Sequence, residues 1–127
     1  MRPRIGIPAL RKDIWKQHRL LHDVLFEMLK IQTFLRGSVY ELNTRCGKPN
    51  CACVEGERHR RWVLSHTPPD GRKRLRVVPD EHYENWRRWA GNYSQFRRRR
   101  AQIVKITRRI LEALDAIERA RRRAPEE

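Results

Sequence analysis

The chain has 127 residues, 39% hydrophobic and 35% charged, which allows one modest core and excludes a large second domain or a large enclosed enzyme cavity. Thirty Lys and Arg against fifteen Asp and Glu give a net charge of +15, more than solubility requires, so a polyanionic partner is expected. The apolar runs are too short to span a bilayer, and the first residues lack the pattern of a signal peptide. A cytoplasmic protein without membrane contact is therefore expected.

The beginning of the chain predicts an arm followed by a helix. Pro3 and Pro8 favour an extended arm over residues 1–10. Apolar residues then recur at steps of three, four or seven over 11–36, which predicts an amphipathic helix that ends at Gly37. The apolar positions of this helix are Ile14, Leu21, Val24 or Leu25, Met28, Ile31 and Leu35.

The middle of the chain, residues 38–79, has the alternation expected of short strands. "SVYELNTR", "RWVLSHT" and "RKRLRVVP" predict three strands, with a turn at "PPDG" between the last two. We expect a small antiparallel sheet, which places the protein in the α+β class.

A long helix is expected over residues 80–120. Asp80 after Pro79 suits an N-cap. Gly91 and Asn92 are weak helix formers, so the alternative is a helix divided into two at these residues. The apolar stripe of such a long helix must be buried against another element, and we expect the first helix to pack against it. Residues 11–120 then form a single domain, followed by a basic tail at 121–127.

All three cysteines lie in the loop "RCGKPNCACVEGERH", residues 45–59. Gly47 and Pro49 allow the chain to turn, and Cys51 and Cys53 are spaced to face the same side. Three thiolates and one imidazole make a closed tetrahedral set that suits structural zinc. The predicted zinc ligands are Cys46, Cys51, Cys53 and His59.

Three alternatives to this ligand set remain. Cys51 and Cys53 also suit a redox pair, and the loop also suits a turn with free thiols. His66 is the rival fourth ligand, although a position within a strand would place it farther from the loop. We prefer His59 because it is closer to the cysteines in the sequence. We prefer zinc because a sheet with few large apolar side chains needs an additional source of stability, which a bound metal supplies.

The catalytic motifs of common enzyme classes are absent from the sequence. A zinc deaminase needs His-x-Glu before Pro-Cys-x-x-Cys, whereas here "HYE" follows the cysteines and "PNCAC" has another spacing. The His-Glu-x-x-His, Gly-x4-Gly-Lys and Gly-x-Ser-x-Gly patterns do not occur. We therefore expect no enzymatic activity.

The stretch "TRCGKPNCAC", a following histidine, the strand "DGRKRLRVVP" and the helix segment "RRWAGNYSQFR" resemble an uncharacterised family of small prokaryotic proteins. Its mark is a Cys-Gly-Lys-Pro-x-Cys-x-Cys loop, and the resemblance extends over residues 33–118. The resemblance implies a small module that is similar to metal-binding ones and has no determined activity, with some members associated with mobile genetic elements. Cys46, Cys51, Cys53 and His59 match the loop, while Arg60, Arg61 and Trp62 replace the usual Gly-Pro-aromatic run.

Basic side chains surround the cysteine loop and recur later in the chain. Trp89 lies off the predicted apolar stripe and suits base stacking, whereas Trp86 and Tyr93 fall on the stripe and are expected in the core. The expected nucleic-acid contacts are Arg45, Lys48, Arg58, Arg60, Arg61, Arg72, Lys73, Arg74, Arg76, Trp89, Arg97, Arg98, Arg99 and Arg100.

Together these features predict a zinc-containing protein that binds DNA or RNA mainly through phosphates, as an accessory factor of a mobile element or defence complex. The alternative is a structural or interaction subunit whose helices form a homodimer or dock on an acidic protein partner.

Overall fold

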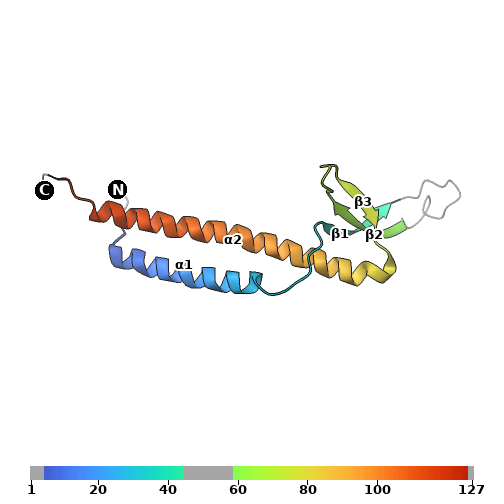
Figure 1. The fold of residues 1–127 in the computed structure, drawn as a ribbon, viewed down its shortest axis with the longest axis horizontal. Helices are drawn as coiled ribbons and strands as arrows, with labels where there is room; N and C mark the ends of the chain where they lie inside the picture. Colours follow the sequence, from blue (N-terminus) through green and yellow to red (C-terminus); the bar gives the residue numbers. More distant parts are fainter. Residues whose placement is uncertain (1–4, 45–58, 126–127) are drawn as a thin grey trace. The chain divides into compact units, whose positions relative to one another are not determined.

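The structure is a computed structural model that describes residues 5–44 and 59–125. The elements in chain order are α1 (Ile7–Met28), β1 (Ser38–Thr44), β2 (His59–His66), β3 (Arg74–Val77), a 3-10 turn (Asp80–His82) and α2 (Tyr83–Arg121) (Figure 1). This order confirms the α+β class, with an N-terminal helix, a three-stranded antiparallel sheet and a long C-terminal helix that packs on the first. Among the described helices, none has the length and apolarity to cross a membrane.

The chain divides into two compact units. The helical unit consists of Met1–Ile31 with Phe96–Glu127, and the sheet unit consists of Gln32–Gln95. Because α2 extends from Tyr83 to Arg121, it contributes its first turns to the sheet unit and the rest to the helical unit. Each unit is described by itself below.

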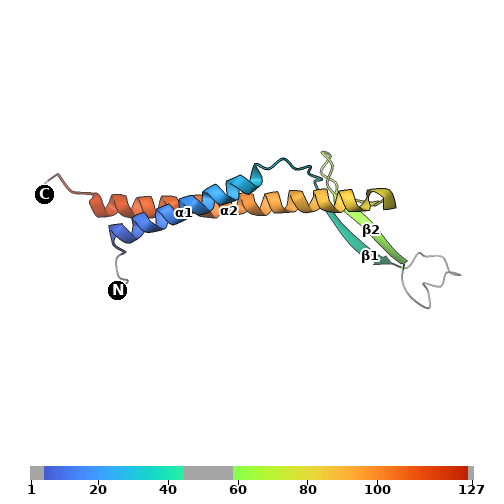
Figure 2. The same cartoon turned by 90° about the horizontal axis from the view of Figure 1, so that it is seen from below.

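In the helical unit, α1 lies alongside the later part of α2 in both ribbon views (Figures 1 and 2). Leu10 of α1 and Ala113 and Ile117 of α2 are buried together, and Ile14 and Ala116 pack against them. The small side chains of Ala113 and Ala116 on α2 leave room for the larger Leu10 and Ile14 of α1. The side chains of one helix thus pack into the grooves of the other.

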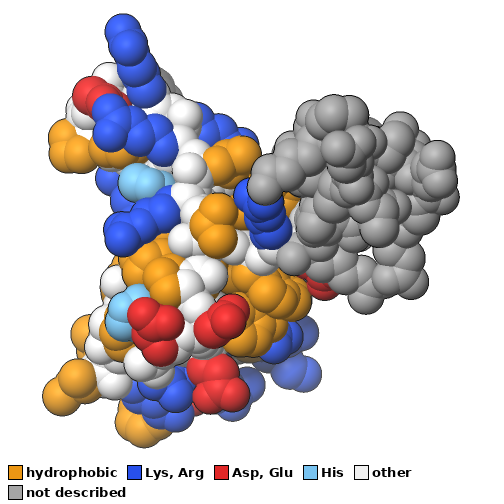
Figure 3. Space-filling view, turned by 90° about the vertical axis from the view of Figure 1, so that its right-hand side faces the viewer, with side chains coloured by type: hydrophobic (Ala, Val, Ile, Leu, Met, Phe, Trp, Pro, Cys, Tyr) orange, Lys and Arg blue, Asp and Glu red, His pale blue; other side chains and the backbone are white. Residues whose placement is uncertain are grey.

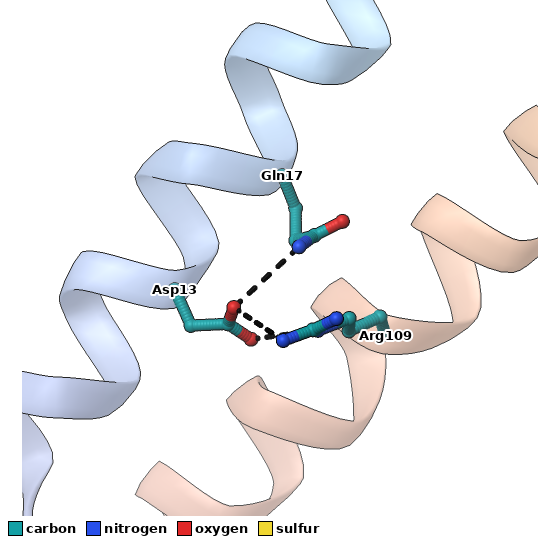
Figure 4. A network of polar contacts seen from close by, with 3 residues as sticks. All are labelled: Asp13, Gln17 and Arg109. Carbon is teal, nitrogen blue, oxygen red and sulfur yellow. Dashed lines mark hydrogen bonds and ion pairs between the residues drawn. The ribbon is translucent and has the colours of Figure 1, made fainter.

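A polar contact joins the two helices beside this apolar core (Figure 4). Arg109 donates to Asp13 from Nε (3.1 Å to Oδ2) and from Nη2 (2.9 Å to Oδ1), and Gln17 donates to Oδ1 from the same helix as Asp13. The hydrogen bond from Arg109 lowers the pKa of Asp13 below its ordinary value of 3.8. A two-pronged contact of this kind fixes how α1 is aligned along α2.

The range 11–36 predicted for the first helix is wrong at both ends. Residues 7–10, assigned to an extended arm, are helical, because Pro8 occupies the first turn, where its missing N–H costs nothing. The helix ends at Met28 and not at Gly37. Farther along, the backbone N–H of Leu35 donates to the carbonyl of Trp89, so this part of the backbone is hydrogen-bonded to α2.

The sheet has the order β1-β2-β3, with β2 in the centre and both pairs antiparallel. Val63 and Leu64 on β2 are buried although they point to opposite faces, as expected for a central strand. The backbone N–H of Val78 donates to the carbonyl of Trp62 and continues the pairing beyond the end of β3. The three predicted strands are thus confirmed.

The second predicted helix begins later than residue 80 and is not interrupted. Asp80–His82 form a 3-10 turn whose N-cap residue is Pro79 and not Asp80, and α2 starts at Tyr83. The helix continues through Gly91 and Asn92. The side chain of Asn92 donates to the carbonyl of Thr33, which gives this weak helix former a role outside the helix.

Candidate nucleic-acid interface and metal loop

The cysteine loop lies between the paired ends of β1 and β2. Cys46, Cys51 and Cys53 are outside the described residues, as are Arg45, Lys48 and Arg58. The backbone of His59 is paired with Thr44 in the sheet register. The two described residues that flank the loop, Thr44 and His59, therefore lie side by side at one end of the sheet.

The rival ligand His66 lies at the other end of the same strand. His59 and His66 are the first and last of the eight residues of β2, and at about 3.3 Å per residue they lie roughly 23 Å apart. His66 is paired with Arg74 of β3, away from the loop. Within residues 5–44 and 59–125, no cluster of three or more His, Cys, Asp or Glu is placed to hold a metal ion. The zinc assignment stays a prediction, and this geometry favours His59 over His66.

The turn before β3 and the strand itself carry four of the predicted nucleic-acid contacts. Arg72, Lys73, Arg74 and Arg76 are all exposed. Asp70 orders this turn, because its carboxylate accepts from the backbone N–H of Arg72 at 3.0 Å and from the guanidinium of Arg74. The Asp70–Arg74 pair is exposed, and such pairs are weak enough for a phosphate to compete with them.

An aromatic cluster connects the sheet to the first turn of α2. The rings of Trp62 and Tyr83 have centroids 4.7 Å apart. The rings of His82 and Trp86 are parallel within 2° at 5.5 Å, and the guanidinium of Arg76 lies 5.2 Å from the centre of the Trp86 ring. Trp86, predicted in the core, is only half-buried, and Trp62 is 37% exposed.

Two of these cluster residues have roles that sequence reasoning missed. His82 is four residues before Trp86, which is the spacing of neighbours on one helix face, and this signal was present in the sequence. The stacking of Arg76 on Trp86 depends on where β3 lies relative to α2, and local spacing does not contain that information.

The other predicted nucleic-acid contacts of the sheet unit lie outside the turn before β3 and the strand itself. Arg61 on β2 is exposed, and the side chain of Arg60 is outside the described part. Trp89 is half-buried, and its carbonyl accepts from Leu35, so it lies beside the segment that follows α1. On the face in Figure 3, Lys and Arg side chains are interspersed with hydrophobic and acidic ones.

The run Arg97–Arg100 belongs to the helical unit and not to the sheet unit. Three of its members are exposed, and Arg99 is half-buried. These four residues are therefore a second basic stretch, described separately from the strand residues.

The comparisons with known proteins give a family for this chain. Residues 14–88 match the model of a family described as a domain of unknown function, DUF6788. The chain belongs to this family. The DUF6788 match begins within α1, includes the three strands and the cysteine loop, and ends within the first turns of α2. The aromatic cluster is thus inside the DUF6788 region, and Arg97–Arg100 are outside it. Comparison with curated proteins gave no match, and comparison with solved structures gave none.

Proposed function

We propose that this protein is a non-enzymatic, zinc-stabilised protein that binds DNA or RNA mainly through backbone phosphates. The observation that carries the proposal is that Arg72, Lys73 and Arg76 are exposed and that Arg76 lies over the ring of Trp86, in a chain with a net charge of +15. Arginine and lysine supply the phosphate contacts that dominate nucleic-acid affinity. On the sequence resemblance alone, we further propose a role as an accessory factor of a mobile genetic element or defence complex.

The zinc part of the proposal rests on the donor set and on the strand register. Three thiolates and an imidazole suit tetrahedral zinc and leave no open position for a substrate. The Thr44–His59 pair holds together the two ends of the segment that carries the cysteines. Zinc bound there would stiffen one end of the sheet, while the basic residues of β3 would do the binding.

Salt dependence tests the phosphate contacts. Binding through about six phosphates to duplex DNA predicts a slope near −5 in a plot of log affinity against log salt concentration. Replacing both Arg72 and Lys73 by Gln should reduce the steepness of this slope by about 2. Fluorescence anisotropy over a salt series measures both quantities.

The matched control is Arg122→Gln, which also removes a cation. Arg122 forms an exposed ion pair with Glu118 in the helical unit, so this variant should keep the slope of the wild type. Absence of binding to duplex or single-stranded DNA or RNA at about 50 to 100 mM salt would disprove the proposed function.

A second candidate function, self-association, is favoured by exposed apolar side chains in the helical unit. Val104, Leu111 and Leu114 of α2 are 45%, 55% and 47% exposed. Steps of seven and three place them on one stripe of the helix. Arg100 lies one turn before this stripe and Glu118 one turn after it, both on the same side of α2. An antiparallel second copy would therefore cover the stripe and place Arg100 opposite Glu118 at each end.

Leucine-to-glutamate substitution tests this self-association. We expect the wild type to sediment as a dimer, and Leu111→Glu to shift it to a monomer by burying a charge at the centre of the interface. Leu20→Glu is the matched control, because Leu20 is 43% exposed on α1 and is not part of the stripe. A wild type that stays monomeric at every concentration, or a Leu111→Glu variant that stays dimeric, would contradict the candidate.

A further inference from the structure

We propose that Trp62, Arg76, His82 and Trp86 form a stacking site for an unpaired base, so that the protein prefers single-stranded or looped nucleic acid to an uninterrupted duplex. This inference rests on the proposed function and adds the form of nucleic acid that is bound. It depends on how the sheet and the start of α2 place four planar side chains together.

The strand register explains why planar groups gather here. Residues that alternate along β2 point to the same face, so Trp62 lies on the face of the buried Leu64. Arg76 of β3 is paired with Leu64 and therefore also points to this face. The start of α2 supplies Tyr83 against Trp62, and Trp86 against Arg76.

The cluster differs from an ordinary apolar core. A guanidinium and an imidazole are costly to bury, and here Arg76 and His82 are both exposed. His82 and Trp86 already stack face to face, parallel within 2°, and Arg76 lies over the Trp86 ring. A planar base can add to such a stack. Base stacking on protein side chains does not depend on the nucleotide sequence, because every base has a π-face.

The sheet unit that holds the cluster also carries further exposed cations. Arg72 and Lys73 precede β3 in the sequence, while Arg87 and Arg88 line an open surface hollow of about 400 Å³ together with Tyr83 and Glu84. The guanidinium of Arg87 lies 6.0 Å from the centre of the Tyr83 ring. Phosphates on either side of a stacked base therefore have cations within the same unit.

The alternative is that these rings only fasten the sheet to α2. An abasic oligonucleotide distinguishes a base-stacking site from a purely structural role of the rings, because it keeps the phosphates and lacks the bases. We expect a single-stranded oligonucleotide to bind at least about 10-fold more tightly than an abasic chain of equal length at the same salt. The base-bearing strand should also bind more tightly than its duplex and quench tryptophan fluorescence.

Conservative variants assign the effect to this cluster. Arg76→Lys keeps the charge and loses the planar guanidinium, and His82→Ala removes a surface ring. Each should lower the ratio of base-bearing to abasic affinity several-fold. Arg72→Lys, on the neighbouring turn, is the matched control and should keep the ratio of the wild type.

Three results would overturn the inference. Equal affinity for the base-bearing and abasic strands would show that only phosphates are bound, while the proposed function would stand. A high ratio that Arg76→Lys and His82→Ala both leave unchanged would place stacking elsewhere. Failure of all three probes to bind at about 50 to 100 mM salt would overturn the proposed function, and this inference with it.

Discussion

Serine at both Cys51 and Cys53 is expected to abolish zinc binding and to unfold the sheet unit. Serine hydroxyls are poor zinc ligands, and zinc contributes on the order of 10 kcal/mol to the folding of zinc-finger peptides. The wild type should contain one zinc per chain by elemental analysis. It should lose its strand signal in circular dichroism when a strong chelator is added, because the sheet has few large buried side chains.

His66→Ala is the matched control for the zinc ligands. It removes an imidazole from the end of β2 opposite to His59, so the zinc content should stay at one per chain. His59→Ala should reduce zinc affinity strongly. Full zinc retention in the double serine variant would contradict the ligand set. Loss of zinc in His66→Ala would show that His66, and not His59, is the fourth ligand.

Gly37→Ala is expected to destabilise the sheet unit by about 1 to 3 kcal/mol, the usual cost of overpacking. A Cβ at this position would lie 2.6 Å from the carbonyl oxygen of Ser65 and 2.9 Å from Cδ1 of Leu64. Ser65 is part of the central strand, paired with Ser38, so its backbone cannot move without disturbing the sheet. Thermal unfolding should show a melting temperature lower by roughly 4 to 8 °C for each kcal/mol lost.

Gly91→Ala is the matched control and should have the opposite sign. Among the described residues, no heavy atom apart from the neighbouring residues and the adjacent helix backbone lies within 4 Å of a Cβ built at Gly91, which is within α2. Alanine in a helix interior is more stable than glycine by about 0.5 to 1 kcal/mol. A Gly37→Ala variant that melts with the wild type would disprove the close approach to β2.

The class of each element was predictable from periodicity, but the helix boundaries were not, and the end of α1 shows why. The apolar spacing continues to Ile31 and Leu35, but α1 ends at Met28 and Ile31 is fully exposed. β-branched Ile31 and Thr33 weaken a helix only slightly. The segment after α1 is hydrogen-bonded to α2 through Leu35–Trp89 and Thr33–Asn92, and such long-range hydrogen bonds leave no local pattern in the sequence.

The candidate site was predictable in its charge and only partly in its geometry. Arg72, Lys73 and Arg76 were expected from composition, whereas the register that places Arg76 on the same face as Trp62 is given only by the structure. The spacing of His82 and Trp86 could be read from the sequence, whereas the contact of Trp86 with Arg76 required the position of α2 relative to the sheet. Trp89, the expected stacking residue, is instead beside the segment after α1.

The continuity of α2 through Gly91 makes the boundary at Gln95 and Phe96 part of a helix and not a linker. A protease that needs an extended substrate cannot cut there until several turns of helix have opened. Helix formation is cooperative, so fraying that begins in one unit spreads along the backbone into the other. Ligand or metal binding in the sheet unit would thus slow hydrogen exchange in the adjoining turns of the helical unit.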